Sequence, residues 1–71
     1  MDSITFFNAR KNDERDYYNV EKIIVHNNGS TISYDPMGLL VDQPHTDSYE
    51  IITRDGHRTM LSNEWIPNHA N

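Results

Sequence analysis

The residues best suited to chemistry are two histidine–carboxylate pairs, His45 with Asp47 and Asp55 with His57. Alternate residues of an extended chain point to the same side, so an imidazole and a carboxylate at this spacing can both ligate zinc or another divalent ion. Two loops would have to meet to complete such a site. Because polar loops carry His and Asp by composition alone, we predict no metal and no cofactor, and keep His45, Asp47 and His57 as weak metal candidates.

Three acids close together in the sequence, Asp42, Asp47 and Glu50, raise the question of carboxylate catalysis. Glycoside hydrolysis needs a cleft that holds two carboxyl groups at a defined separation and shifts the pKa of one of them by burial. No cleft follows from this sequence, so we interpret these side chains as solvated. Residues 32–53 contain no Lys or Arg, and the middle of the chain is therefore expected to carry negative potential.

Other routes to catalysis lack their signatures. The chain has no cysteine and only three isolated glycines, so it has neither a thiol nucleophile nor a Gly-rich phosphate loop. It also lacks the Gly-x-Ser-x-Gly and His-Glu-x-x-His motifs. We predict that the protein is not an enzyme.

Charge and apolar content limit the partners and the location. Eleven acids against six bases give a net charge of −5, and the bases are scattered, which disfavours direct nucleic-acid binding. No apolar stretch approaches the roughly 20 residues of a membrane span, and the start lacks the basic and apolar regions of a signal peptide. With the absence of cysteine, these features predict a cytoplasmic protein with no membrane contact.

The clearest structural signal is a pair of β-hairpins. Residues 20–25 are rich in β-branched side chains, and Asn28 and Gly29 then supply the positive φ angles of a tight reversal. Polar and apolar side chains alternate in residues 31–34, which form the returning strand.

The second hairpin follows the same logic. Residues 49–53 lead into a turn that contains Asp55 and Gly56, and residues 58–61 return. Residues 39–41 are predicted as a short strand between the hairpins. Together these segments predict a mostly β or small α+β fold, with a twisted antiparallel sheet of four or five short strands.

The flanking segments carry weaker signals. Residues 62–66 are predicted as a short helical turn, because Ser62 can cap it and Pro67 discourages its continuation. Residues 8–19 are polar without a period, which indicates a loop, and residues 4–7 are either a short strand or an adhesive arm. The combination of short strands, tight turns and a helical turn near the C-terminus resembles an SH3-like small β-barrel in architecture, without a family motif.

The chain is predicted to form one small domain, residues 1–71, because 71 residues allow a single core. Residues 20–67 form its compact hairpin core. Residues 1–19 either belong to this core or form an arm that is flexible or ordered by a partner.

The aromatic residues are too many for one small core to bury completely. Tyr34, Tyr49 and Trp65 are assigned to the core. If residues 4–7 form a strand, Phe6 and Phe7 point to opposite faces, and only one of them enters the core. Aromatic side chains outside the core are favoured anchors in protein interfaces.

We therefore expect a non-enzymatic, small acidic protein-binding module, in the manner of accessory or inhibitory proteins that occupy a partner's basic surface. The alternative hypothesis is a self-associating structural protein, a homodimer formed through an edge strand or the N-terminal arm. A weak nucleic-acid-binding module that stacks bases on Tyr and Arg is the third. The candidate interface residues are Phe7, Tyr17, Tyr18, Asp42, Asp47 and Glu50.

Overall fold

The structure, a computed structural model, describes residues 3–39 and 45–68 of the chain. These residues form seven β-strands: β1 (Ile4–Asn8), β2 (Asp13–Tyr17), β3 (Val20–Asn27), β4 (Ser30–Tyr34), β5 (Ser48–Thr53), β6 (Arg58–Ser62) and β7 (Trp65–Asn68). The prediction of a mostly β fold is confirmed. The described segments hold no helix, and hence none that could span a membrane.

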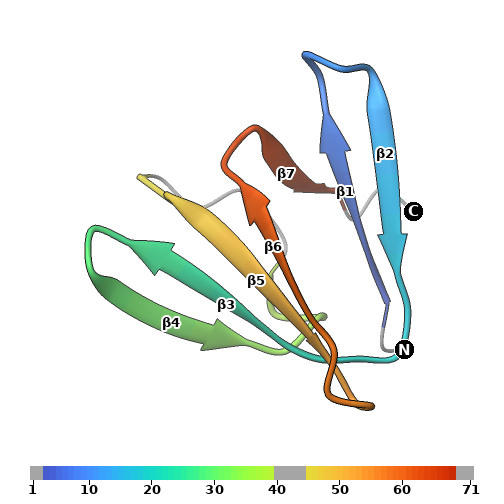
Figure 1. Cartoon of the computed structure of the whole chain (residues 1–71), viewed down its shortest axis with the longest axis vertical. Helices are drawn as coiled ribbons and strands as arrows, with labels where there is room; N and C mark the ends of the chain where they lie inside the picture. Colours follow the sequence, from blue (N-terminus) through green and yellow to red (C-terminus); the bar gives the residue numbers. More distant parts are fainter. Residues whose placement is uncertain (1–2, 40–44, 69–71) are drawn as a thin grey trace.

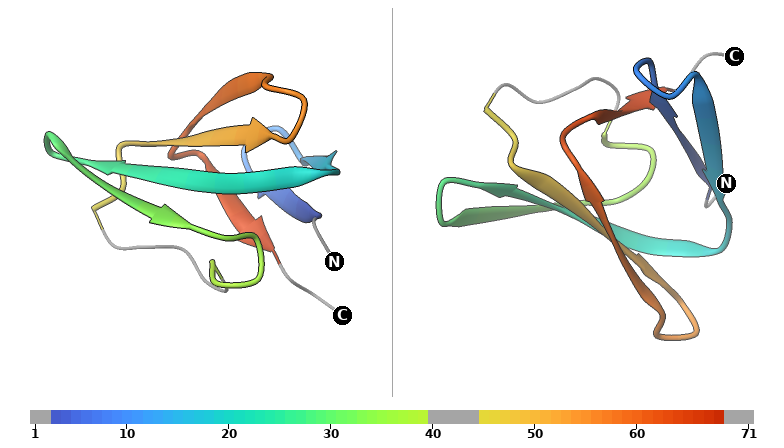
Figure 2. Two further views of the ribbon diagram at one scale, coloured as in Figure 1. Left: turned by 90° about the horizontal axis from the view of Figure 1, so that it is seen from below. Right: turned by 45° about the horizontal axis from the view of Figure 1, so that its top comes forward.

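The strands form two antiparallel sheets instead of one (Figure 1). The three-stranded sheet has the order β2-β1-β7, and the four-stranded sheet has the order β4-β3-β5-β6. The two predicted hairpins make up the four-stranded sheet, and they join through antiparallel pairing of β3 with β5. The sheets face each other at an angle and do not close into a barrel, so the likeness to an SH3-like barrel stops at short strands and tight turns (Figure 2).

Both predicted turns contain the backbone conformation that their residues favour. Asn28 and Gly29 have φ angles of 50° and 87°, as a two-residue hairpin turn of type I′ requires. Gly56 has a φ of 94° in the turn between β5 and β6. Local turn chemistry therefore sets the register of both hairpins.

The helical turn predicted for residues 62–66 is wrong. Asn63 and Glu64 form a tight turn between β6 and β7, and Trp65 begins β7. The backbone nitrogen of Glu64 does lie 3.4 Å from the Ser62 hydroxyl oxygen, which is the contact that the capping signal implied. Pairing of β7 with β1, which buries Trp65, overrides that local preference.

The loop predicted for residues 8–19 is also wrong in part, because it contains strand β2. This strand pairs with β1 in continuous register from Asp13 to Tyr17. All its side chains except Tyr17 are exposed, so the segment has no hydrophobic period to recognise. Residues 4–7 fall within β1, whose alternating burial places Ile4 and Phe6 in the core.

One hydrophobic core fills the space between the sheets. Its fully enclosed large side chains include Phe6 from the three-stranded sheet and Tyr49 from the four-stranded sheet, with ring centroids 5.2 Å apart. Trp65 is also buried and Tyr34 packs against the core, as predicted. Leu39 is buried without belonging to a strand, and the other two residues of the strand predicted for 39–41 lie outside the described segments.

Candidate binding surface

Strand β4 lies at an edge of the four-stranded sheet, with β3 on one side. The two-residue turn makes Asn27 and Ser30 a hydrogen-bonded pair, and such pairs alternate along an antiparallel ladder. The backbone groups of Ser30, Ile32 and Tyr34 therefore point toward β3. Those of Thr31 and Ser33 point away from it, and they present two N–H and two C=O groups to the outside.

The sequence of β4, Ser-Thr-Ile-Ser-Tyr, carries no charge and no proline. Side chains of Ser30, Thr31 and Ser33 are exposed, and Ile32 is 53% exposed. Ile32 lies opposite Val25, a core residue, so its side chain is on the face of the sheet that covers the core. A strand added beside β4 would extend both the backbone ladder and this apolar row.

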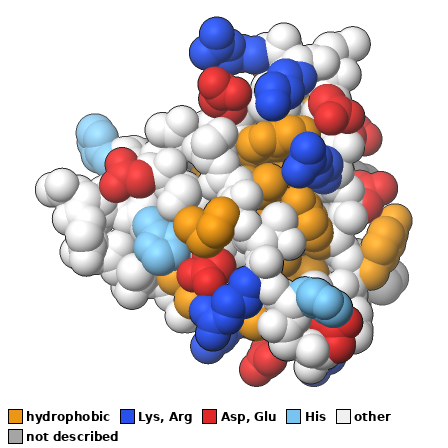
Figure 3. Space-filling model, viewed as in Figure 1, with side chains coloured by type: hydrophobic (Ala, Val, Ile, Leu, Met, Phe, Trp, Pro, Cys, Tyr) orange, Lys and Arg blue, Asp and Glu red, His pale blue; other side chains and the backbone are white. Residues whose placement is uncertain are grey.

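The other strand edges in the described segments carry features that discourage such pairing. Strand β2 has four charged residues among five, β6 begins with Arg58, and β7 contains Pro67, which has no N–H group. In the space-filling view, charged side chains gather over the β1–β2 hairpin, whereas the left-hand margin over the β3–β4 turn is largely white (Figure 3). Among the strand edges that the structure describes, β4 alone lacks both charge and proline.

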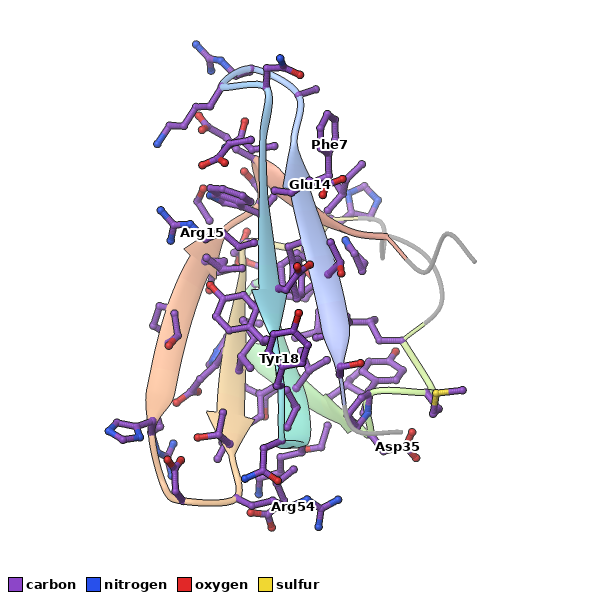
Figure 4. The ribbon with its side chains drawn as sticks, turned by 90° about the vertical axis from the view of Figure 1, so that its right-hand side faces the viewer. Phe7, Glu14, Arg15, Tyr18, Asp35 and Arg54 are labelled. Atoms are coloured by element: carbon purple, nitrogen blue, oxygen red, sulfur yellow. The ribbon has the colours of Figure 1, made fainter. Side chains whose placement is uncertain are left out.

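Strand β2 is also protected on its inner face. Arg15 lies opposite Phe6, and its guanidinium carbon is 4.7 Å from the ring centroid of Trp65. This cation–π contact covers the indole beside the edge. In Figure 4, Arg15 projects from one side of the β1–β2 ribbon and Phe7 from the other.

Two exposed acids lie near the two ends of the β3–β4 hairpin, Asp35 after β4 and Asp47 before β5, on the other side of β3 from β4. Asp35 follows β4 directly, and its Oδ1 accepts a 2.8 Å hydrogen bond from the backbone N–H of Gly38. At the turn end, Oδ2 of Asp47 accepts a 2.7 Å hydrogen bond from the backbone N–H of Asn28. Both carboxylates are thus held in place by backbone donors.

An open hollow lies between the end of β3, the segment before β5 and the β6–β7 turn. Its polar lining consists of Asn27, Asn28, His45, Thr46, Asp47 and Asn63. Asn63 donates a 3.1 Å hydrogen bond from Nδ2 to the carbonyl of Thr46, and the backbone N–H of Asp47 donates to the carbonyl of His26. These bonds tie the segment before β5 to the end of β3, and so position Asp47.

Glu50, one of the acidic candidates, is engaged within the four-stranded sheet. Its carboxylate oxygens lie 2.8 Å from a guanidinium nitrogen of Arg58 and 3.2 Å from Nε2 of His26. Hydrogen bonds from Arg58 and then His26 hold the pKa of Glu50 below its ordinary value. Glu50 therefore joins three strands, while the candidate Asp42 lies outside the described segments.

The aromatic candidates all lie on or beside the β1–β2 hairpin, in the other sheet from β4. Tyr17 is half-buried against the core, and its ring is nearly perpendicular to that of Phe6 at a centroid distance of 6.2 Å. Phe7 is half-buried between Glu14 and Ile66 on the neighbouring strands. Tyr18 is 68% exposed, and its hydroxyl oxygen lies 3.4 Å from Oδ2 of Asp16.

The two histidine–carboxylate pairs lie at opposite ends of β5, so the structure does not bring them together. His45 and Asp47 precede the strand, and Asp55 and His57 follow it. The His57 ring lies 3.0 Å from Asp55 within its own turn. Within residues 3–39 and 45–68, no three His, Cys, Asp or Glu side chains gather as metal ligands would.

Sequence reasoning predicted β4 as a strand but did not identify its edge as a surface. The sequence of β4 contains no charge and no proline, but this composition indicates an unprotected edge only when the strand order shows that β4 lies at the margin of the sheet. Comparison of the chain with protein-family models, curated proteins and solved structures finds no match.

Proposed function

We propose that this chain is a non-enzymatic protein-binding module that receives an extended segment of another protein along β4. The observation that carries the proposal is the outer edge of β4, which pairs with no strand among residues 3–39 and 45–68 and where Thr31 and Ser33 direct backbone groups outward from an uncharged strand. Addition of a strand to such an edge is a recurrent mode of peptide recognition.

The energetics of this edge suit reversible binding. A partner strand would form hydrogen bonds with Thr31 and Ser33, each with a net contribution of about 1 kcal/mol. Complete burial of an isoleucine contributes about 1.5–3 kcal/mol, so covering the exposed half of Ile32 would add roughly 1 kcal/mol. A five-residue edge is therefore expected to bind with modest affinity.

The contacts of the other candidate residues support binding over catalysis. His26 and Arg58 hold Glu50 between strands, and Asp55 stabilises its own turn through Thr53 and His57. These polar groups stabilise the four-stranded sheet and its turn. The outer edge of β4 is therefore the feature of this sheet that we assign to partner binding.

Substitution of Ser33 tests the proposal, because its N–H points away from β3. Ser33→Pro removes that donor from the free edge without removing a bond of the β3–β4 ladder, and Ser33→Thr is the matched control that keeps it. Peptides selected from a random display library on the wild-type chain should bind Ser33→Pro at least tenfold more weakly, which is about 1.4 kcal/mol. They should bind Ser33→Thr as they bind the wild type.

Amide hydrogen exchange locates the contact independently. The Thr31 and Ser33 amides should exchange rapidly in the free chain and slowly with a selected peptide bound. Failure to select any peptide, or peptides that bind Ser33→Pro unchanged and protect other strands, would contradict the proposal.

A further inference from the structure

The outer face of the three-stranded sheet carries side chains that take no part in the core or in the β4 edge. Burial alternates along β1, so Phe6 enters the core, whereas Thr5 and Phe7 lie on the other face. The strand register places the exposed Glu14 and the 38% exposed Ile66 on either side of Phe7. One acid and two apolar side chains therefore form a row across β2, β1 and β7.

A second row lies beside the first on the same face. Asp16 is opposite Thr5, and its Oδ1 accepts a 2.6 Å hydrogen bond from the Thr5 hydroxyl. The Tyr18 hydroxyl oxygen lies 3.4 Å from Oδ2 of the same carboxylate, and the Tyr18 side chain is 68% exposed. Glu14 and Asp16 are alternate residues of β2, so they are about 7 Å apart along the strand. The face thus combines two neighbouring carboxylates with exposed aromatic and aliphatic side chains.

Bases of the described segments do not neutralise these two carboxylates. None of the ion pairs recorded between described residues includes Glu14 or Asp16. On the same hairpin, Arg10 contacts Glu64 at 3.3 Å, and Arg15 projects from the opposite side of the ribbon (Figure 4). Positive charge that complements this face is therefore left for a partner to supply.

We propose that the outer face of the three-stranded sheet is a second docking surface, whose partner is a protein segment that presents arginine beside an apolar side chain. Arginine fits better than lysine, because its planar guanidinium can both pair with a carboxylate and stack on an aromatic ring. The other face of β2 already contains such a stack, between Arg15 and Trp65. The partner's apolar side chain would cover Phe7 and Ile66, so both chemistries of the face have a complement.

A second copy of this chain fits the face poorly. The net charge of the chain is −5, and two such faces brought together would oppose their carboxylates. Three of the four arginines, Arg10, Arg15 and Arg58, already make ion-pair or ring contacts within the chain. The proposed partner is therefore a different, basic protein.

Three synthetic peptides with one scaffold and blocked ends test this chemistry. The probe, Ala-Arg-Ala-Ala-Leu-Arg-Ala-Ala-Leu-Arg-Ala-Ala-Leu-Ala, favours a helix with Arg and Leu on adjoining stripes, and its counterparts carry Lys or Glu in place of Arg. By fluorescence anisotropy at low salt, the Arg peptide should bind roughly tenfold more tightly than the Glu peptide and about threefold more tightly than the Lys peptide. Added salt should reduce the first ratio.

Two double variants with the same loss of charge assign the binding to its residues. Glu14→Gln with Asp16→Asn should abolish the preference for the Arg peptide over the Glu peptide. Asp35→Asn with Asp47→Asn removes two exposed acids elsewhere and should largely retain it. Tyr18→Ala should weaken binding of the Arg peptide about threefold, whereas Tyr18→Phe keeps the ring and should bind as the wild type does.

The outcomes separate this face from net charge and from the β4 edge. Equal loss of binding in the two double variants would show a response to net charge alone and would overturn the inference, as would an Arg peptide that does not bind. Equal binding of the Arg and Lys peptides would overturn the preference for arginine. Ser33→Pro should leave binding unchanged, and amide chemical-shift changes should be confined to β1, β2 and β7. Loss of binding in Ser33→Pro would place the peptide on β4 and would overturn the second surface.

Discussion

The hairpins β1–β2 and β3–β4 each end a sheet with an exposed strand, but the two exposed strands differ in chemistry. Strand β2 carries Asp13, Glu14, Arg15 and Asp16, whereas β4 carries only serine, threonine, isoleucine and tyrosine. In both hairpins the inner strand supplies core residues, Phe6 from β1 and Ile23 from β3. Similar anchoring thus supports, among the described strands, one edge that is charged and one edge that is uncharged.

The comparison also separates two kinds of negative charge. Three acids against the single base Arg15 make β2 clearly negative, which discourages a further strand from pairing there. Asp35 follows the uncharged strand β4, whereas Asp47 precedes β5 on the other side of β3. Charge within a strand discourages pairing at its edge, which distinguishes β2 from β4.

The largest predicted effect tests whether both hairpins share one core. Phe6→Ala should reduce the free energy of unfolding by about 3–5 kcal/mol, because it empties a fully enclosed site beside Tyr49. Urea unfolding followed by Trp65 fluorescence and by far-UV circular dichroism should show one shared, shifted transition. Phe7→Ala on the other face of β1 is the control and should cost clearly less.

The same experiment would show that the two hairpins do not share one core if residues 1–19 act as an arm. In that case Phe6→Ala would leave the unfolding of the four-stranded sheet unchanged. Phe6→Leu gives a milder cavity and keeps the measurement possible if the alanine variant does not fold.

The second prediction compares the turns of the two hairpins. Gly29→Ala should cost about 1–2 kcal/mol, because Gly29 has a φ of 87° and an added Cβ meets no atom within 4 Å, so the cost lies in the backbone alone. Asn12, in the β1–β2 turn, has a φ of 51°, and Asn12→Gly should change stability by less than about 0.5 kcal/mol. Urea midpoints provide both values, and equal effects would contradict the assigned turn geometry.

These turns show what local chemistry can predict. Asn28-Gly29 and Asp55-Gly56 require particular φ angles whatever the rest of the chain does, so both hairpins were predicted with nearly the observed bounds. The alternation of Phe6 and Phe7 likewise predicted that only one of the two rings would enter the core, and the structure shows that it is Phe6.

The missed features depend on contacts between distant residues. Strand β2 exists because it pairs with β1, and its exposed charged side chains contain no sign of that pairing. Residues 62–66 contain a real capping signal, but burial of Trp65 beside Asn8 decides their conformation. The open edge was missed for the same reason, because only the strand order β4-β3-β5-β6 places β4 at a margin.

The third prediction concerns the protected edge. Arg15→Ala should cost about 0.5–1 kcal/mol, because it removes the cation–π contact with Trp65. Trp65 fluorescence of the folded variant should shift to longer wavelength as water reaches the indole. Lys11→Ala removes an exposed positive charge from the same hairpin and should change neither quantity, whereas matching effects would assign the contribution to net charge instead of the contact.

The smallest predicted effect concerns the β5–β6 turn. Side-chain hydrogen bonds of Asp55 stabilise this turn, so it serves as a reference for the turns of the other two hairpins. Donation by the Thr53 hydroxyl, followed by the interaction with His57, lowers the pKa of Asp55 from 3.8 to about 2. A carboxyl group with a lowered folded-state pKa stabilises the fold when it is ionised, so its contribution is present above about pH 4 and is lost as the pH falls toward 2. Asp55→Asn should therefore be less stable than the wild type at pH 6, and their urea midpoints should converge near pH 2. The effect of Gly29→Ala should stay constant over the same range, because no charge takes part in that turn; a constant difference for Asp55→Asn would show that its carboxylate does not stabilise the fold through ionisation.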